Sequence, residues 1–146
     1  MYTDTVTIFN KLKVGQVITW YPTVLHNVDL NTDKGANVAK TGLESADTAK
    51  LHIRYTLTDG AITIVGKPYK GPKEWVAQQA ESLAGSLTVA SGDLFMRGEY
   101  PETVINNDDY KKDFQDYLNN TYDDVYLITT VGGPYKLIPH FEIGGK

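Results

Sequence analysis

The chain has 146 residues, and 14 Lys and Arg stand against 18 Asp and Glu, which gives a formal charge of −4. This length predicts a single domain, and 41% hydrophobic with 22% charged residues is typical of a globular protein rather than a disordered one. The absence of cysteine excludes disulfides, thiolate metal sites and cysteine nucleophiles. No apolar run reaches the roughly 18 residues of a membrane-spanning helix, the N-terminus lacks a signal-peptide pattern, and a pI near 5.3 argues against a dedicated nucleic-acid binder.

The composition favours β structure, and the first part of the chain contains alternating runs. Sixteen Thr, twelve Val and ten Tyr outnumber four Phe and two Met, and the three abundant types suit a pleated, half-buried surface. Thr5–Phe9 alternates polar and apolar side chains and predicts a first strand. Val17–Leu30 is also strand-like. Pro22 within it predicts a bulge, an edge or a bend, because proline has no N–H to give to a ladder.

Residues 31–49 form the longest loop candidate, because they show no apolar periodicity. Loops longer than about 12–15 residues without structure of their own are usually functional or mobile. We therefore expect this segment to make contacts with other molecules.

A hairpin is expected next. Asp59-Gly60 separates the alternating runs Leu51–Thr58 and Ala61–Val65. Asp-Gly favours a type I′ turn, because both turn positions need positive φ. The alternation of the first run predicts one shared face for Ile53, Tyr55 and Leu57.

The middle of the chain also predicts two helices and a second hairpin. Pro72–Ala84 combines a proline suited to the first helical turn with apolar residues at helical spacing. Ser91-Gly92 lies between Ser86–Ala90 and Asp93–Arg97 and predicts a tight hairpin. Asp108–Asn119 predicts a second short helix, which Asn or Asp can cap at its start.

The C-terminal part completes the pattern. Asp124–Val131 predicts a strand, Gly132-Gly133-Pro134 a turn, and Tyr135–Ile143 a last strand interrupted at Pro139, with a mobile tail over 144–146. Many short strands at close spacing indicate a mainly β fold. We expect one domain over 1–146, a β-barrel or sandwich of short antiparallel strands with two short helices inserted.

No motif predicts catalysis or metal binding. His26, His52 and His140 lie singly, without the close spacing of a zinc site, and His52 is expected on a solvent-facing strand position. Asp108-Asp109 is explained by helix capping, and Asp123-Asp124 by the flank of a strand. Phosphate loops, nucleophile elbows and dinucleotide fingerprints are missing. We predict a protein that is not an enzyme and has no cofactor and no metal.

Candidate interface residues follow from loop position alone. Tyr beside Pro or Gly can anchor an interface, since it carries apolar area with a polar tip, or can stack within the chain. Basic residues in the middle of the chain predict a solvated loop surface, with contact to an acidic neighbour or to DNA as the sharper hypothesis. Trp75 is expected in the core more than at an interface. The candidate residues are Lys34, Asn37, Lys40, Thr41, Tyr69, Lys70 and Trp75.

Several short segments, spread over most of the chain, carry a resemblance to known proteins. These segments are Asp4–Asn10, Leu25–Val28, Thr41-Gly42, Ser45–Asp47, Gly92–Leu94, Arg97–Glu99 and Pro139–Lys146. Together they resemble small structural proteins of tailed bacteriophages and prophages of Gram-positive bacteria, in the family encoded among head-completion and neck genes. The opening strand and the Gly-Asp segment are also similar to head-closure proteins.

The resemblance implies a function and a location. Head-closure proteins are small β-barrels that form a ring below the portal, so it implies a homo-oligomer, with a hexamer favoured. It also implies contact with an adaptor or portal above and tail proteins below, and retention of packaged DNA. The expected location is the virion neck, assembled in the cytoplasm of the bacterial host, with no membrane partner. This chain is longer and has helix-like inserts at Pro72–Ala84 and Asp108–Asn119, so a tail-terminator or other minor capsid role stays open.

Two other classes of function stay open at this point. A ligand-binding β module for glycan or a host surface would use exposed Trp20, Trp75 and turn tyrosines to stack on sugar rings. A small hydrolase would need a triad assembled across space, with His26, His52 or His140 as its base.

Overall fold

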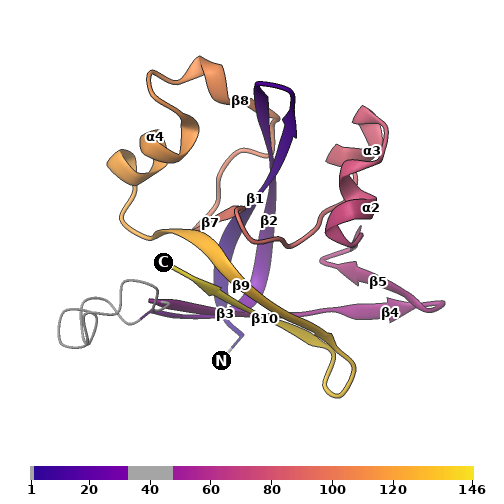
Figure 1. Ribbon diagram of the computed structural model, residues 1–146. Coiled ribbons are helices and arrows are strands. Elements are labelled where there is room, and N and C mark those ends of the chain that lie inside the picture. The colour runs from indigo at the N-terminus through magenta and orange to yellow at the C-terminus, as the bar shows by residue number, and fades with distance from the viewer. Residues whose placement is uncertain (1, 33–47) are drawn as a thin grey trace.

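The computed structural model describes residues 2–32 and 48–146, and its centre is a closed antiparallel β-barrel (Figure 1). Six strands follow the order β1-β7-β9-β10-β3-β2, and pairing of β2 with β1 closes the sheet. The mainly β prediction is therefore confirmed, with a barrel rather than a sandwich. The strands are β1 (Asp4–Val14), β2 (Val17–Thr32), β3 (Ala49–Arg54), β7 (Leu94–Arg97), β9 (Val125–Tyr135) and β10 (His140–Gly145).

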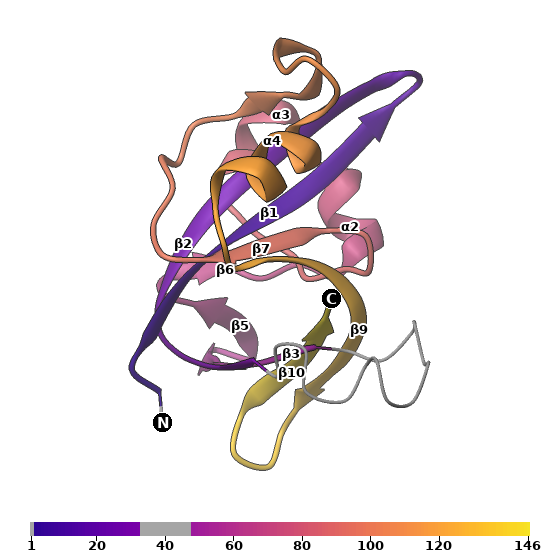
Figure 2. The ribbon, with the colours of Figure 1, turned by 90° about the vertical axis from the view of Figure 1, so that its left-hand side faces the viewer.

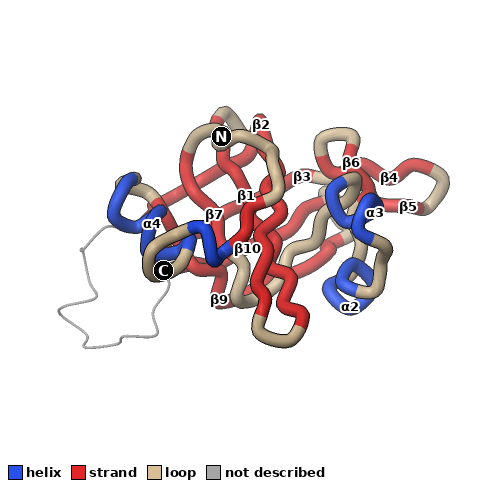
Figure 3. Tube along the Cα trace, turned by 90° about the horizontal axis from the view of Figure 1, so that it is seen from above, coloured by secondary structure: helices blue, strands red, loops and turns tan. Residues whose placement is uncertain are grey.

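Shorter elements lie around the barrel. A small three-stranded sheet follows β3, one short strand adds to the outer edge of β2, and three short α-helices and a 3-10 helix occur in the described residues. Seen from above, α4 lies on one side of the barrel and α2 and α3 lie on the other (Figure 3). These elements are β4 (Thr56–Thr58), β5 (Ala61–Ile64), β6 (Lys67–Pro68), β8 (Ile105–Asn106), α2 (Pro72–Val76), α3 (Ala80–Ala84), η1 (Asn107–Asp109) and α4 (Phe114–Thr121).

Two hydrophobic clusters result from this arrangement. One fills the barrel and includes Ile8, Leu51 and Phe141. The other lies between α4 and the strands and includes Phe9, which packs edge-on against Phe114 at 5.2 Å between ring centroids. Adjacent residues of a strand point to opposite faces, yet Ile8 and Phe9 are both fully buried. The outer face of β1 is thus covered by α4.

The helices begin and end at other residues than predicted. Pro72–Ala84 is two helices, because the backbone is extended at Gln79, the residue that precedes α3. The second predicted helix begins at Phe114 rather than at Asp108. Its N-cap is Asp113, whose carboxylate accepts from the Asp116 N–H at 2.7 Å.

One predicted hairpin forms and the other does not. Asp59 and Gly60 have φ of 52° and 80° and join β4 to β5, as the Asp-Gly pair predicts. The run Leu51–Thr58 is split at Tyr55 between two sheets, so Ile53 and Tyr55 are buried while Leu57 is 52% exposed. The hairpin at Ser91-Gly92 is wrong, because β7 pairs with β1 and β9 instead of with 86–90.

The C-terminal boundaries also differ from the prediction. Gly132-Gly133-Pro134 belongs to β9, and the chain turns only after Tyr135. The mobile tail over 144–146 is wrong: Gly144 and Gly145 are in β10, and Lys146 exchanges two backbone hydrogen bonds with Leu127, of 2.9 and 3.0 Å. Gly145 leaves no room for a side chain, since an added Cβ would lie 2.9 Å from Phe95.

The predicted loop over 31–49 is shorter at both ends. Asn31 and Thr32 belong to β2 and pair with Lys50 and Ala49 of β3. β2 and β3 thus extend beyond the residues with an apolar pattern, because their backbones pair with each other. The rest of the predicted loop, 33–47, lies outside the described residues.

A buried polar cluster attaches the segment before β7 to β1. The Asn10 side chain donates to the Thr88 carbonyl at 2.6 Å and to Asp93 at 3.0 Å, and its oxygen accepts from the Thr88 N–H. The Asp93 carboxylate also accepts from the backbone N–H groups of Lys11 and Ala90. These bonds hold 86–93 as a strap across β1, which explains why it does not pair with β7.

Replacing Asn10 tests this cluster. We expect Asn10→Ala to lower the free energy of unfolding by about 2–4 kcal/mol, because three hydrogen bonds are lost and their partners stay buried. Asn120→Ala is the matched control, since Asn120 is exposed and its side chain donates to Asp116 at 3.2 Å in an exposed contact. It should change stability by less than about 0.5 kcal/mol in the same urea titrations. Equal effects of the two variants would contradict the role of the strap.

The acid at the centre of the cluster predicts a pH dependence. Burial raises the pKa of Asp93 from 3.8 to about 6, against the opposing effect of its hydrogen-bond donors. The folded state therefore binds this proton more tightly than the unfolded state. Its contribution to stability is complete below about pH 4 and is lost as the pH rises through about 6, an effect of about 3 kcal/mol.

Two measurements check this dependence. The carboxyl carbon of Asp93 should titrate in NMR spectra with a midpoint near 6. The stability difference between the wild type and Asp93→Asn should shrink with rising pH between 4 and 7, because the variant cannot titrate there. A difference that stays constant over this range would count against the prediction.

Candidate functional site

The structure describes three of the seven predicted interface residues. Lys34, Asn37, Lys40 and Thr41 lie outside the described residues. Tyr69 is half-buried, with its ring 4.9 Å from that of Phe141, and burial raises the pKa of its hydroxyl. The Lys70 ammonium lies 3.9 Å from the Glu74 carboxylate, on the surface.

Both tryptophans are buried. Trp75 is fully buried and packs edge-on against Tyr21, so its expected place in the core is confirmed and its side chain offers no surface to a partner. Trp20 is 3% exposed, and its indole N–H donates to Asn107 at 3.1 Å. Stacking of these two rings on sugars, as the glycan hypothesis requires, is therefore excluded in this conformation.

A row of ionisable side chains crosses three neighbouring strands on the outside of the barrel. Asp29 of β2 is opposite His52 of β3, and His52 is opposite Glu142 of β10. One nitrogen of His52 lies 3.8 Å from the Asp29 carboxylate, and the other lies 4.0 Å from that of Glu142. His140 joins the row, since its Nε2 is 2.9 Å from Glu142. The structure thus brings two of the three scattered histidines together.

The row borders an open pocket of about 270 Å³. Gly132 of β9, the position opposite Glu142, has no side chain, and Lys50, His52 and Tyr135 are among the walls. An added Cβ at Gly132 would lie 2.5 Å from the Tyr135 hydroxyl, so glycine is needed for this ring to fold over the strand.

The contact between His140 and Glu142 favours the charged form of both groups. The hydrogen bond to Glu142 raises the pKa of His140, and the Ile138 carbonyl, 2.6 Å from the other ring nitrogen, acts in the same direction. The imidazolium donates from both nitrogens, so it suits two oxygen partners. The same bond lowers the pKa of the Glu142 carboxyl. Lys50, His52 and Glu142 line the pocket, so it can hold a polar ligand by charge and hydrogen bonds.

The described residues support neither metal binding nor a membrane-spanning helix. In residues 2–32 and 48–146, no group of three or more His, Asp or Glu is placed to hold a metal ion. Among the helices that the structure describes, none has the length and apolarity to cross a membrane.

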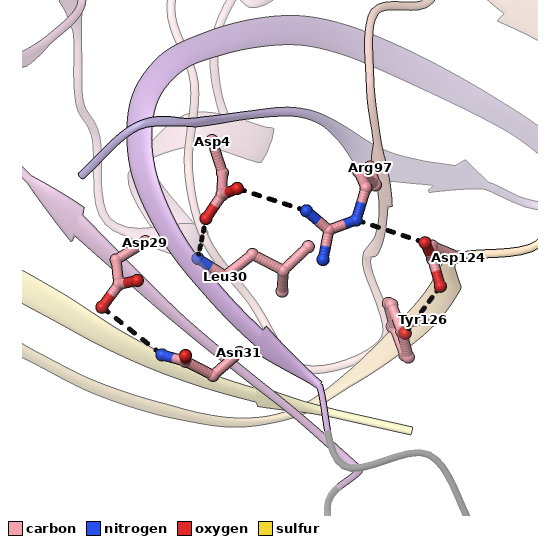
Figure 4. Close-up of polar contacts among 7 residues, drawn as sticks. All are labelled: Asp4, Asp29, Leu30, Asn31, Arg97, Asp124 and Tyr126. Atoms are coloured by element: carbon pink, nitrogen blue, oxygen red, sulfur yellow. Dashed lines mark hydrogen bonds and ion pairs between the residues drawn. The ribbon is translucent and has the colours of Figure 1, made fainter. Parts of the chain in front are cut away.

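A second polar network fastens the end of the barrel (Figure 4). Arg97 of β7 lies 3.2 Å from Asp4 of β1 and 3.2 Å from Asp124, which precedes β9. Asp4 also accepts from the Leu30 N–H of β2 at 2.9 Å, and the Tyr126 hydroxyl donates to Asp124. One guanidinium therefore connects strands that are far apart in sequence.

Two hairpin ends carry exposed apolar side chains. Val14 and Val17 at the end of β1–β2 are 65% and 51% exposed. Leu137 and Ile138, between β9 and β10, are 87% and 72% exposed. Figure 2 shows that these two hairpins project from the barrel in different directions.

Sequence reasoning missed the row and the hairpin ends. The row depends on strand register, which brings Asp29, His52 and Glu142 side by side. The sequence did contain a signal for the β9–β10 end, because Leu137 and Ile138 directly precede Pro139, where the predicted last strand is interrupted. That run was assigned to a strand, so its exposure was not expected.

Removing one carboxylate tests the row. In Glu142→Gln we expect the pKa of His140 to fall, because the charged hydrogen-bond acceptor is lost. The measurement is an NMR titration of the His140 ring protons. Glu81→Gln, which removes an exposed carboxylate elsewhere, should leave the His140 midpoint in place. An unchanged midpoint in Glu142→Gln would contradict the assigned contact.

Comparison with known proteins identifies a family but no activity. No curated protein and no solved structure matches this chain. One family model matches residues 1–146, and its description is "Family of unknown function (DUF6751)". Because the match extends over the whole chain, the protein belongs to this family.

Proposed function

We propose that this protein is a non-enzymatic structural component of a phage virion, in the neck between head and tail. The observation that carries the proposal is a closed barrel whose projecting hairpins end in exposed apolar side chains. Exposed apolar groups concentrated at such ends are typical of protein contact surfaces. The resemblance of the sequence to head-completion and head-closure proteins supports the location.

The architecture suits a ring subunit in two ways. The barrel leaves its hairpins free to reach neighbours, and the Arg97 network and both hydrophobic clusters keep their bases in place. The hairpins also point in different directions, so one subunit can contact several neighbours at once (Figure 2). The proposed partners are further copies in a ring, with a hexamer favoured, an adaptor or portal on one side and tail proteins on the other. Non-specific contact with packaged DNA belongs to the same proposal, as does a tail-terminator or minor capsid position in its place.

A ligand-binding module is the second candidate, and the pocket beside Gly132 favours it. Tyr135 and the row of ionisable groups supply an aromatic surface and polar partners. Because the tryptophans are buried, ligand binding should be followed by NMR shifts of Tyr135 and His140 during titration with glycan fragments. Shifts at these residues would support this candidate, and unchanged spectra would remove its basis.

The neck proposal predicts the composition of particles. Mass spectrometry of gradient-purified particles, induced from the source strain, should find this protein at a ring-like copy number relative to the portal. Its presence in the lysate together with its absence from the particles would overturn the proposal. A much higher copy number, comparable with the major capsid protein, would also contradict a neck position.

A further inference from the structure

The outer edge of β2 carries a groove. This edge pairs with β8 at Thr19 and Trp20 and with β3 from Asp29 onward. Within residues 2–32 and 48–146, no strand pairs with the stretch between on that side. Two hollows of about 390 and 380 Å³ lie along it and share Val24, Glu99 and Glu102. The exposed Val65 borders the larger one.

A side chain takes the place of a strand at this edge. The Val24 N–H donates to the Glu102 carboxylate at 2.9 Å. Residues two apart along a strand direct their N–H to the same edge, so Pro22, which has none, is tolerated there. Pro22 therefore lies at a strand edge, which is one of the three possibilities, with a bulge and a bend, that the sequence predicts for it.

The rim of the groove carries negative charge. Lys67 donates to Thr23 at 2.9 Å, and Lys67 and Glu102 both line the larger hollow. Burial lowers the pKa of Lys67, and Glu102 opposes that shift. Glu99 is exposed and borders both hollows. It gives the rim its negative charge.

The end of the β9–β10 hairpin has the complementary character. Leu137 and Ile138 are its exposed apolar residues, and Lys136 beside them is exposed and basic. Within one chain this end and the groove are apart: in Figure 2 the hairpin turns at the bottom, while the β7–β8 connection with Glu99 runs along β2 on the left. A chain therefore does not fill its own groove.

Backbone conformation marks both surfaces. Val65 and Ile138 each have φ of 51°. A β-branched residue in this region is a genuine outlier, and glycine or asparagine would largely avoid the strain. Both residues are also exposed, so neither conformation is offset by burial within the chain.

We propose that the β9–β10 hairpin end of one copy, with Lys136, Leu137 and Ile138, docks in the β2-edge groove of a second copy. In this contact Val24, Val65 and Pro101 of the groove pack against Leu137 and Ile138. The Glu99 carboxylate pairs with the Lys136 ammonium. Such a contact joins two different surfaces, so repetition gives a ring when the rotation closes. The inference rests on the proposed ring function and specifies the surfaces that would build it.

The lack of cysteine allows a clean crosslinking test. Two single-cysteine variants, Ile138→Cys and Val65→Cys, are mixed at high concentration and oxidised mildly, or treated with a short bismaleimide. Crosslinked pairs between the two variants should form, because a disulfide needs Cα atoms within about 7 Å. Ile138→Cys mixed with Leu57→Cys is the control, since Leu57 is exposed to a similar degree on another hairpin. A yield no higher than in this control would overturn the proposal.

Charge reversal makes the test specific. Lys136→Glu on the Ile138→Cys chain should lower the yield by roughly two- to fivefold, and so should Glu99→Lys on the Val65→Cys chain. Combining the two reversed chains should restore it. Failure of this rescue would exclude the Lys136–Glu99 pairing.

A glycine substitution separates docking from folding. Ile138→Gly should leave the free energy of unfolding equal or higher, because the strained φ becomes unstrained. The same variant should weaken self-association in sedimentation experiments. Unchanged association would contradict docking of the hairpin end. Particles that contain the protein while crosslinks are absent would reject this interface and leave the neck function standing.

Discussion

The double pairing of β1 is the constraint on which the rest of the structure depends. Its first residues pair with β2 on one edge and with β7 on the other, and this closes the sheet. Closure removes the free edges that an open sheet would expose. β1 is also buried on both faces, since Ile8 faces the barrel interior and Phe9 is covered by α4. The Asn10–Asp93 cluster, directly after Phe9, then fixes the strap that leads into β7.

Local chemistry explains which elements could be predicted from sequence. The alternation of Thr5–Phe9 and the Asp59-Gly60 turn reflect preferences of a few adjacent residues, and both are found as expected. Gly132-Gly133-Pro134 has the composition of a turn, yet it is part of β9 because it lies opposite β10, with Tyr135 folded over Gly132. The tail was expected to be mobile because it is short and glycine-rich. Its pairing with Leu127 depends on a strand that only the folded barrel brings near.

The candidate site was harder to predict than the fold, because it depends on register. Asp29, His52 and Glu142 carry no shared motif, and they meet only because three strands pair with one particular alignment. A shift by one residue in any of these strands would turn the ionisable side chain of that strand into the barrel.

The interface prediction placed Trp75 at the surface only as the lesser alternative, since a tryptophan at helical spacing is usually core. Its complete burial follows that preference.

The two strained hairpin turns connect folding with assembly. In most turns a residue with positive φ is glycine, asparagine or aspartate, and Asp59-Gly60 in this chain follows that rule. Val65 and Ile138 break it at the two surfaces that have opposite charge and exposed apolar area. Stability of the single chain gives no reason to keep a β-branched side chain at either turn, because the strain is unfavourable and the side chain is left in water. Burial against another copy, as in the proposed docking, would offset both costs together.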